Sequence, residues 1–241
     1  DMEWGIPVPV PGYEHKRIYV WWEAVIGYLS ASIQWSKEQG QPDLWKDWWK
    51  NPEAKSYYFI GKDNIPFHSI RWPAVLMGIG DLNLPYDIPA NEFLNLEGRK
   101  LSTSNNWAVW LDDYLKEYDP DPLRYVLTAT APETSDSDFS WAEFLRRNND
   151  ELVGWWGNLV NRSISFTNKH FQGEVPEAEF TDEDKEIIAR SKETFAKVGQ
   201  LISECQFKQA LAEAMELARE GNRYFDSQAP WKEVKVDKQR T

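Results

Sequence analysis

The hydrophobic pattern of the chain changes once, near residue 107, and this change limits its possible folds more than any other feature. Before it, short apolar runs such as 17–22 and 56–62 alternate with stretches of helical periodicity. After it, apolar residues recur at helical spacing through most of the remaining chain. Alternating strands and helices are typical of parallel α/β architecture, whereas successive amphipathic helices are typical of an antiparallel bundle. We therefore expect an α/β part followed by an all-α part.

The length of the chain, 241 residues, allows two modest domains. We expect residues 1–118 to form the α/β domain and to run into a connecting helical stretch that ends at about residue 137. We expect residues 138–241 to form the helix bundle. The boundary between the two domains is thus predicted between residues 118 and 138.

Within the α/β part, the continuous apolar runs at 17–22 and 56–62 predict two strands that are buried on both faces. A helix is expected from Glu23 to about Ser36, and a second helix is expected to open at Asp63. Short strands are expected at 87–90 and 92–95. Because ligands bind beyond the carboxyl ends of parallel strands, the strand-to-helix junctions are the expected binding rim.

Within the helical part, we expect helices at 107–116, at 122–130, from Ser140 to about Phe171 with a bend near 148–150, at 181–204 and at 206–223, and a loop at 134–138. Ser140 with Glu143, and Thr181 with Asp184, match the pattern of a helix-capping box.

The segment 97–104 places two cations, a glycine and three hydroxyls within eight residues. Backbone N–H groups and hydroxyls can donate to phosphate oxygens, and a lysine can neutralise charge that develops on a leaving pyrophosphate. The same residue types also form ordinary solvent-exposed turns, and no Walker A sequence is present. The segment alone therefore permits a phosphate site without requiring one.

Charge and composition exclude several classes of protein. A net charge of −12 argues against a general nucleic-acid surface, so a polyanion would need a local basic patch. A single cysteine argues against a disulfide framework. Three histidines and one cysteine without H-x-x-H or C-x-x-C spacing predict no metal site and in particular no zinc site. Without an 18-residue apolar run, we expect a soluble, cytoplasmic protein with no membrane partner.

Three separated segments resemble class I methionyl-tRNA synthetases in order and spacing. Residues 19–28 (Y-V-W-W-E-A-V-I-G-Y) resemble the amino-acid pocket, and residues 59–68 (F-I-G-K-D-N-I-P-F-H) resemble the following strand–helix junction. Residues 100–104 (K-L-S-T-S) resemble the K-M-S-K-S loop, whereas 158–162 and 229–231 resemble the anticodon-reading positions. The resemblance implies the second half of a Rossmann-type catalytic domain followed by an anticodon-binding helix bundle.

The resemblance further implies ATP-dependent activation of methionine, with Mg2+, and transfer to tRNA(Met). It assigns methionine binding to Trp21, Ala24, Val25, Tyr28, Asp63, Asn64, Phe67 and His68. It assigns ATP binding to Gly61, Lys62, Asp63, Lys100 and Ser102, and catalysis to Lys62, Lys100, Ser102, Thr103 and Ser104. It assigns anticodon binding to Asn158, Arg162 and Trp231.

Each of these residues also has a purely structural interpretation when it is taken alone. Trp21 and Tyr28 are typical core aromatics, and a lone His68 is more often bonded to a backbone group than used as a ligand or base. Asn158 and Arg162, four residues apart, could form a solvated helix face, and Trp231 could cap the bundle.

Two departures from the family pattern stand out. Thr103 replaces the second lysine of the loop, and either Lys62 or Arg99 could compensate for the lost cation. The H-I-G-H motif is absent. We therefore expect a C-terminal-side part of the enzyme that is inactive alone and needs the N-terminal half as a partner. Two alternatives stay open: a non-catalytic tRNA-binding module on a degenerate scaffold, and a related class I synthetase for another apolar amino acid.

Overall fold

The structure is a computed structural model that describes residues 3–175 and 177–236. It divides into two compact units, Asp1–Asn91 and Glu92–Thr241. Among the described residues, no helix combines the length and the apolar character needed to span a membrane.

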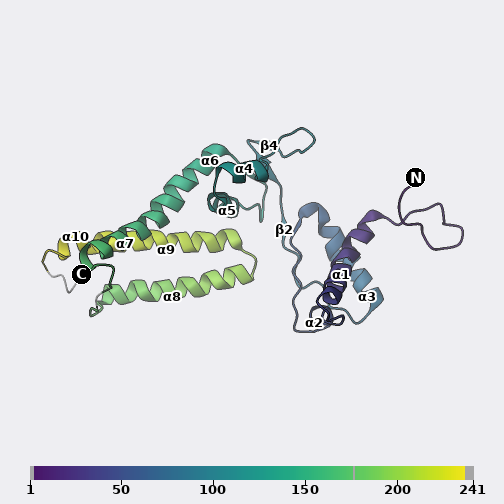
Figure 1. Ribbon diagram of the computed structural model, residues 1–241, viewed down its shortest axis with the longest axis horizontal. Coiled ribbons are helices and arrows are strands. Elements are labelled where there is room, and N and C mark those ends of the chain that lie inside the picture. The colour runs from purple at the N-terminus through teal and green to yellow at the C-terminus, as the bar shows by residue number, and fades with distance from the viewer. Residues whose placement is uncertain (1–2, 176, 237–241) are drawn as a thin grey trace. The chain divides into compact units, whose positions relative to one another are not determined.

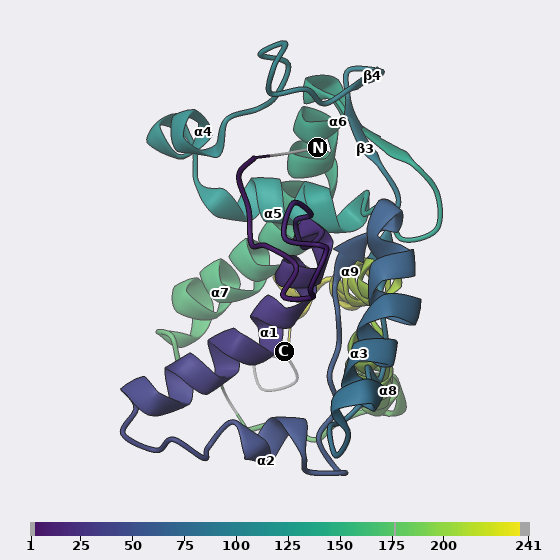
Figure 2. The same cartoon turned by 90° about the vertical axis from the view of Figure 1, so that its right-hand side faces the viewer.

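Unit 1 is built from two main helices and a minimal sheet (Figures 1 and 2). Strands β1 and β2 are parallel, with Ile60 paired to Ala90 and Gly61 paired to Asn91. A 3-10 turn and a π-helical turn lead from β1 into α3. The elements are α1 (Val20–Glu38), α2 (Lys46–Trp49), β1 (Ile60–Gly61), η1 (Lys62–Asn64), η2 (Phe67–Arg71), α3 (Trp72–Ile79) and β2 (Ala90–Asn91).

The core of unit 1 is aromatic. Its buried members are Val25, Trp49, Tyr58, Trp72 and Leu76. Trp72 is fully buried, and its indole Nε1 donates a hydrogen bond to the Tyr58 hydroxyl at 2.9 Å. The bond satisfies the indole N–H, so the core can hold the fully buried Trp72 ring without leaving its donor unpaired.

The predicted buried strand at 17–22 is wrong, because α1 already begins at Val20. The apolar side chains of Val20, Trp21 and Trp22 are 58%, 37% and 41% exposed. The predicted helix from Glu23 is confirmed, with Val25 and Ser36 on its buried side. The predicted strand at 56–62 reduces to β1 and an isolated parallel bridge between Tyr57 and Asp87.

Unit 2 combines a three-stranded sheet with the helix bundle. In the sheet order β4-β3-β5, β3 is antiparallel to β4 and parallel to β5. The elements are β3 (Leu94–Leu96), β4 (Arg99–Lys100), α4 (Leu111–Glu117), α5 (Pro120–Ala129), β5 (Ser137–Phe139), α6 (Trp141–Arg146), η3 (Arg147–Gly157), α7 (Asn158–Phe171), α8 (Asp182–Ser203), α9 (Phe207–Gln228) and α10 (Pro230–Glu233).

The predicted helices of the second half are present, and α8 and α9 run side by side in opposite directions (Figure 1). Both predicted caps form: the Ser140 hydroxyl accepts from the Glu143 amide, and Thr181 and Asp184 make a complete capping box. The bend expected near 148–150 is the π-helical segment η3, which joins α6 to α7. The loop predicted at 134–138 is wrong at its end, where β5 pairs with β3.

Candidate functional site

The first candidate site lies in unit 1, where the N-terminal part of α1 meets the segment η1–η2. The rings of Trp21 and Phe67 stack with centroids 4.7 Å apart and planes at 30°. The Arg71 guanidinium lies over the Phe67 ring at 4.3 Å. Two segments that the sequence places far apart therefore present stacked apolar rings, which suit a flexible thioether side chain.

His68 organises the polar side of this site. Its side chain is 4% exposed. Its Nδ1 lies 2.9 Å from the Asn64 carbonyl oxygen, and its Nε2 lies 2.9 Å from the Tyr28 hydroxyl. A carbonyl can only accept, so Nδ1 carries the hydrogen and, in the neutral ring, Nε2 accepts from Tyr28. The relay fixes the His68 ring and leaves the Tyr28 oxygen able to accept from a ligand.

A wall of buried rings supports this relay. Tyr58 meets Tyr28 edge to face at 5.3 Å and His68 at 5.8 Å. Burial raises the pKa of the Tyr58 hydroxyl despite the opposing effect of the hydrogen bond from Trp72. Tyr58 therefore stays a neutral wall of the site.

The other predicted methionine residues of unit 1 differ in accessibility. Val25 is buried on the core side of α1, whereas Ala24 and Tyr28 on the same helix are exposed. Asn64 is half-buried, and its carbonyl is the His68 partner described above.

The strand–helix junction after β1 contributes the predicted nucleotide-binding residues. Gly61 ends β1 in extended backbone, and Lys62, Asp63 and Asn64 form the 3-10 turn η1. Asp63 is exposed, whereas Lys62 is half-buried. The turn thus places a carboxylate and an ammonium at the carboxyl end of a parallel strand, the position where α/β sheets bind ligands.

The loop that contains Lys100, residues 100–107, lies in unit 2 and is called the lysine loop. Hydrogen bonds between its two ends close it. Ser102 and Trp107 exchange two backbone hydrogen bonds of 3.0 and 2.8 Å, and the Asn106 amide donates to the Thr103 carbonyl at 3.1 Å. The Ser102 and Ser104 hydroxyl oxygens lie 3.2 Å apart. Residues 103–106 are exposed. The loop therefore presents hydroxyls and backbone amides to solvent from a fixed base.

The two cations at the base of this loop have different aromatic partners. The Lys100 ammonium lies 5.4 Å from the centroid of Phe93, and the Arg99 guanidinium stacks on Trp107 at 4.1 Å. They are consecutive residues of β4, and successive strand side chains point to opposite faces. Lys100 and Arg99 consequently serve different sides of the strand.

Another candidate site in unit 2 is formed by residues of α7, α9 and α10. Arg162 forms an ion pair with Asp226 at 2.5 Å. Its guanidinium lies 4.7 Å from the Phe225 centroid and 5.6 Å from the Trp231 centroid. The structure therefore brings the side chains of Arg162 and Trp231, which lie far apart in the sequence, into one cluster.

Asn158 lies one turn before Arg162 on α7. Its side-chain amide donates to the Asn222 side-chain oxygen at 3.4 Å, and Asn222 itself donates to the Trp155 and Ala218 carbonyls. Asn158 is exposed. It is thus tethered weakly, with its remaining hydrogen-bonding capacity on the surface.

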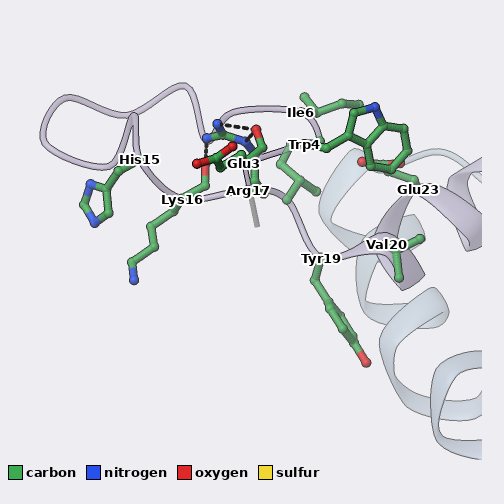
Figure 3. A pocket seen from close by; sticks show the side chains of 11 residues that line it. Glu3, Trp4, Ile6, His15, Lys16, Arg17, Tyr19, Val20 and Glu23 are labelled. Atoms are coloured by element: carbon green, nitrogen blue, oxygen red, sulfur yellow. Dashed lines mark hydrogen bonds between the residues drawn. The ribbon is translucent and has the colours of Figure 1, made fainter. Parts of the chain in front are cut away.

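A further hollow, which sequence reasoning missed, lies beside the hairpin at the start of unit 1 (Figure 3). Its volume is about 810 Å3, and its walls include Trp4, His15, Tyr19 and Glu23. Arg17 donates to the carbonyl oxygens of Glu3, Glu14 and Lys16 and so ties the hairpin together. The sequence signal that could have found it is the run His15-Lys16-Arg17, which follows three prolines and two glycines between residues 5 and 12.

Among residues 3–175 and 177–236, no group of three or more histidine, cysteine, aspartate or glutamate side chains is arranged to hold a metal ion.

Comparison with known proteins gives consistent matches along the chain. A family described as tRNA synthetases class I (M) matches residues 1–164, and the anticodon binding domain of methionyl tRNA ligase matches residues 175–241. The methionine–tRNA ligase of Thermomicrobium roseum is 58% identical over 240 residues, and that of Roseiflexus castenholzii is 54% identical over 248 residues. These alignments cover 99% and 100% of this chain but only 41% and 42% of the relatives.

A solved structure agrees with the sequence matches. The crystal structure of Mycobacterium tuberculosis methionyl-tRNA synthetase bound by methionyl-adenylate superposes with a TM-score of 0.80 at 31% identity. The match covers 95% of this chain and 43% of that one. The chain therefore spans about two fifths of the length of the relatives it matches.

Proposed function

Because the chain belongs to the class I methionyl-tRNA synthetase family, we propose that it supplies part of a methionine–tRNA ligase. The reaction is the ATP-dependent activation of methionine to methionyl-adenylate, followed by transfer to tRNA(Met). The relatives reported above are methionine enzymes, so neither a ligase for another apolar amino acid nor a non-catalytic module is favoured. We also propose that the protein acts in the cytoplasm.

We propose that methionine binds between the stacked rings of Trp21 and Phe67 and the relay of Tyr28 and His68. Ala24, Val25 and Asn64 border this pocket, and Asp63 lies at its exposed end. The support is physical: the thioether needs apolar, polarisable walls, while the relay holds the one polar edge in a fixed orientation.

We propose an ATP-binding role for two groups of residues, each considered within its own unit: Gly61, Lys62 and Asp63 after β1, and Lys100 and Ser102 in the lysine loop. In the first half-reaction, the methionine carboxylate attacks the α-phosphorus, and the bond to the β-phosphate breaks. Negative charge develops on the departing pyrophosphate. Lys100 and Lys62 would neutralise it, and Ser102, Thr103 and Ser104 would donate hydrogen bonds. Gly61 leaves space for the nucleotide, and Mg2+ would accompany ATP as its counter-ion.

We propose that Arg162, Trp231 and Asn158 read the CAU anticodon. Bases splayed out of a single-stranded loop stack on indole and guanidinium planes, and an exposed amide can bond a base edge. The cation–π contact between Arg162 and Trp231 supports this assignment, because it holds both planes in one patch.

The observation that carries the proposal is the contact of residues 21–28 with residues 64–68, through the stacked rings of Trp21 and Phe67 and the hydrogen bond between Tyr28 and His68. The decisive experiment is methionine-dependent exchange of pyrophosphate into ATP. It is run with the 241-residue chain alone and with a polypeptide covering the portion of a relative to which this chain does not align. Methionine-dependent exchange in either of these two reactions supports the proposal. Absence of exchange from both reactions counts against it.

Variants refine this test. Lys100→Ala should lower the exchange rate about 100-fold with little change in the methionine KM, because the ammonium acts on charge that appears only in the transition state. Lys116→Ala is the matched control, since Lys116 is exposed and its ion pair is with Asp113 on its own helix α4. An equal loss in both variants would remove the special role of Lys100.

A further inference from the structure

The aromatic surface on unit 2 does not stop at Arg162 and Trp231. Phe225, which contacts both, meets the Phe166 ring at 6.2 Å and 88°. Phe166 in turn meets the His170 ring at 4.6 Å and 39°. The rings come from α7, α9 and α10, which gather at one end of unit 2 (Figure 1). They form one continuous platform, defined here as Arg162, Phe166, His170, Phe225 and Trp231.

Burial separates this platform from a packed core. Trp231 is 40% exposed, and Phe166, His170 and Phe225 are half-buried. None of them belongs to the buried cluster of unit 2. Rings packed for stability alone would be expected inside such a cluster, whereas rings arrayed in contact at the surface are suited to receiving another flat group.

The platform is long enough to receive more than one base. Arg162 and His170 are eight residues apart on α7, or about 12 Å along the helix axis. A base that stacks on His170 is therefore a different base from the one that stacks on Arg162 and Trp231.

Cations adjoin both ends of the platform. Lys169 precedes His170 in the last turn of α7, and Lys232 and Lys235 lie in and just after α10, all three exposed. Glu179 and Glu233 line a hollow that Phe225 also lines. The carboxylate of Asp226 is occupied by Arg162. Aromatic rings interleaved with cations are the pattern that binds single-stranded nucleic acid, since every base has a face that can stack.

We propose that the Phe166–His170 pair is an additional stacking position that takes a nucleotide flanking the anticodon in the tRNA loop. This inference rests on the proposed anticodon role of Arg162 and Trp231. The contact is through a ring face, so it adds affinity for a single-stranded loop with little preference for base type.

The test is fluorescence anisotropy of the full 241-residue chain with an RNA hairpin that carries a CAU loop. His170→Ala should weaken binding about tenfold, whereas His170→Phe, which keeps a flat ring, should bind within about threefold of the parent. His15→Ala is the matched control, because His15 is an exposed histidine of unit 1, and it should have no effect.

A second arm leaves the protein unchanged. Abasic substitutions are scanned through the loop positions outside CAU. At one position the abasic hairpin should bind the parent chain about tenfold more weakly, and there the difference between the parent and His170→Ala should vanish. No such position, or a His170→Phe variant as weak as His170→Ala, overturns the stacking role.

Failure of this inference is distinguishable from failure of the proposed function. Arg162→Ala and exchange of CAU for another triplet test the anticodon role itself. If both weaken binding while His170→Ala does not, only the additional stacking position is refuted. If neither weakens binding, the anticodon role falls, and the stacking position falls with it.

Discussion

Glu143 on α6 is the carboxylate whose environment makes the sharpest prediction about stability. It accepts from Arg146 Nε and Nη2, both at 2.8 Å, and from Arg147 Nε at 2.6 Å. Both arginines also bind the buried Glu151, which accepts from the Tyr125 hydroxyl at 2.7 Å. The hydrogen bond from Arg146 and the charges of both arginines lower the pKa of Glu143 from 4.5 to about 2.

A shift of this size corresponds to at most about 3.5 kcal/mol of native-state stabilisation. The Glu143 side chain is 32% exposed, so solvent screening reduces the expected value to about 1.5 kcal/mol. The folded-state pKa is depressed, so this stabilisation is fully present above about pH 4.5. It is lost as the pH falls from about 4.5 towards about 2. Glu143→Gln should therefore destabilise α6 and η3 by about 1.5 kcal/mol at pH 7 and by little near pH 2.

The assay must be local, because two compact units need not unfold together. Hydrogen exchange of the amides in 141–157, read by mass spectrometry and corrected for the intrinsic pH dependence, reports the opening free energy of this segment. Glu186→Gln is the control, since Glu186 is exposed on α8 and has no ion pair among the described contacts. A loss of protection that is the same at pH 7 and pH 3, or no loss at pH 7, would refute the reasoning.

Three further predictions concern single contacts in unit 2, each measured by hydrogen exchange as a change in the opening free energy of the element that carries the substituted residue. Thr194→Val should stabilise by about 1 kcal/mol, because the Thr194 hydroxyl is buried on α8 without a hydrogen-bond partner in the described chain; a loss would mean that the hydroxyl is satisfied. Thr181→Ala should cost about 1 kcal/mol, since it removes half of the capping box of α8. Gly98→Ala should also cost about 1 kcal/mol, because Gly98 has φ +72°, a left-handed conformation that strains alanine. The added methyl group would contact no other atom, so no packing gain would offset this strain.

The fold class and the family resemblance were both predictable from the sequence and are confirmed. The helix bundle was the most predictable part, because its signals are local. The caps at Ser140 and Thr181 and the helical spacing of apolar residues act within one or two turns of chain. The domain boundary expected at 118–138 stays a prediction, and the compact units of the structure divide between Asn91 and Glu92.

The error at residues 17–22 shows where local signals fail. A short apolar run is compatible with a buried strand or with one turn of helix, and hydrophobicity alone cannot decide between them. Here the helical spacing of the buried Val25 and the half-buried Leu29 extends α1 back to Val20. The three apolar residues at its start then lie on an accessible turn.

The residues of the candidate sites could be named from the sequence and stay predictions, whereas their contact partners could not be named. Trp21 and Phe67 could be named from the sequence, but their stacking depends on how α1 packs against η2. Asp226, the partner of Arg162, lies 64 residues away from it in the chain. Such a pair is set by the crossing of two helices, and no spacing rule in the sequence marks it.

The lost loop lysine at position 103 is a case in which the structure narrows a choice that the sequence leaves open. Arg99 and Lys62 were both possible substitutes. Arg99 stacks on Trp107, whose indole Nε1 is itself fixed by the Leu96 carbonyl at 3.0 Å. To join Lys100, the guanidinium would have to cross to the other face of β4 and give up a contact worth about 0.5–1 kcal/mol. Within unit 2, Lys100 is therefore better placed than Arg99 to make the proposed phosphate contact of the lysine loop, and Arg99 acts as a brace for the loop.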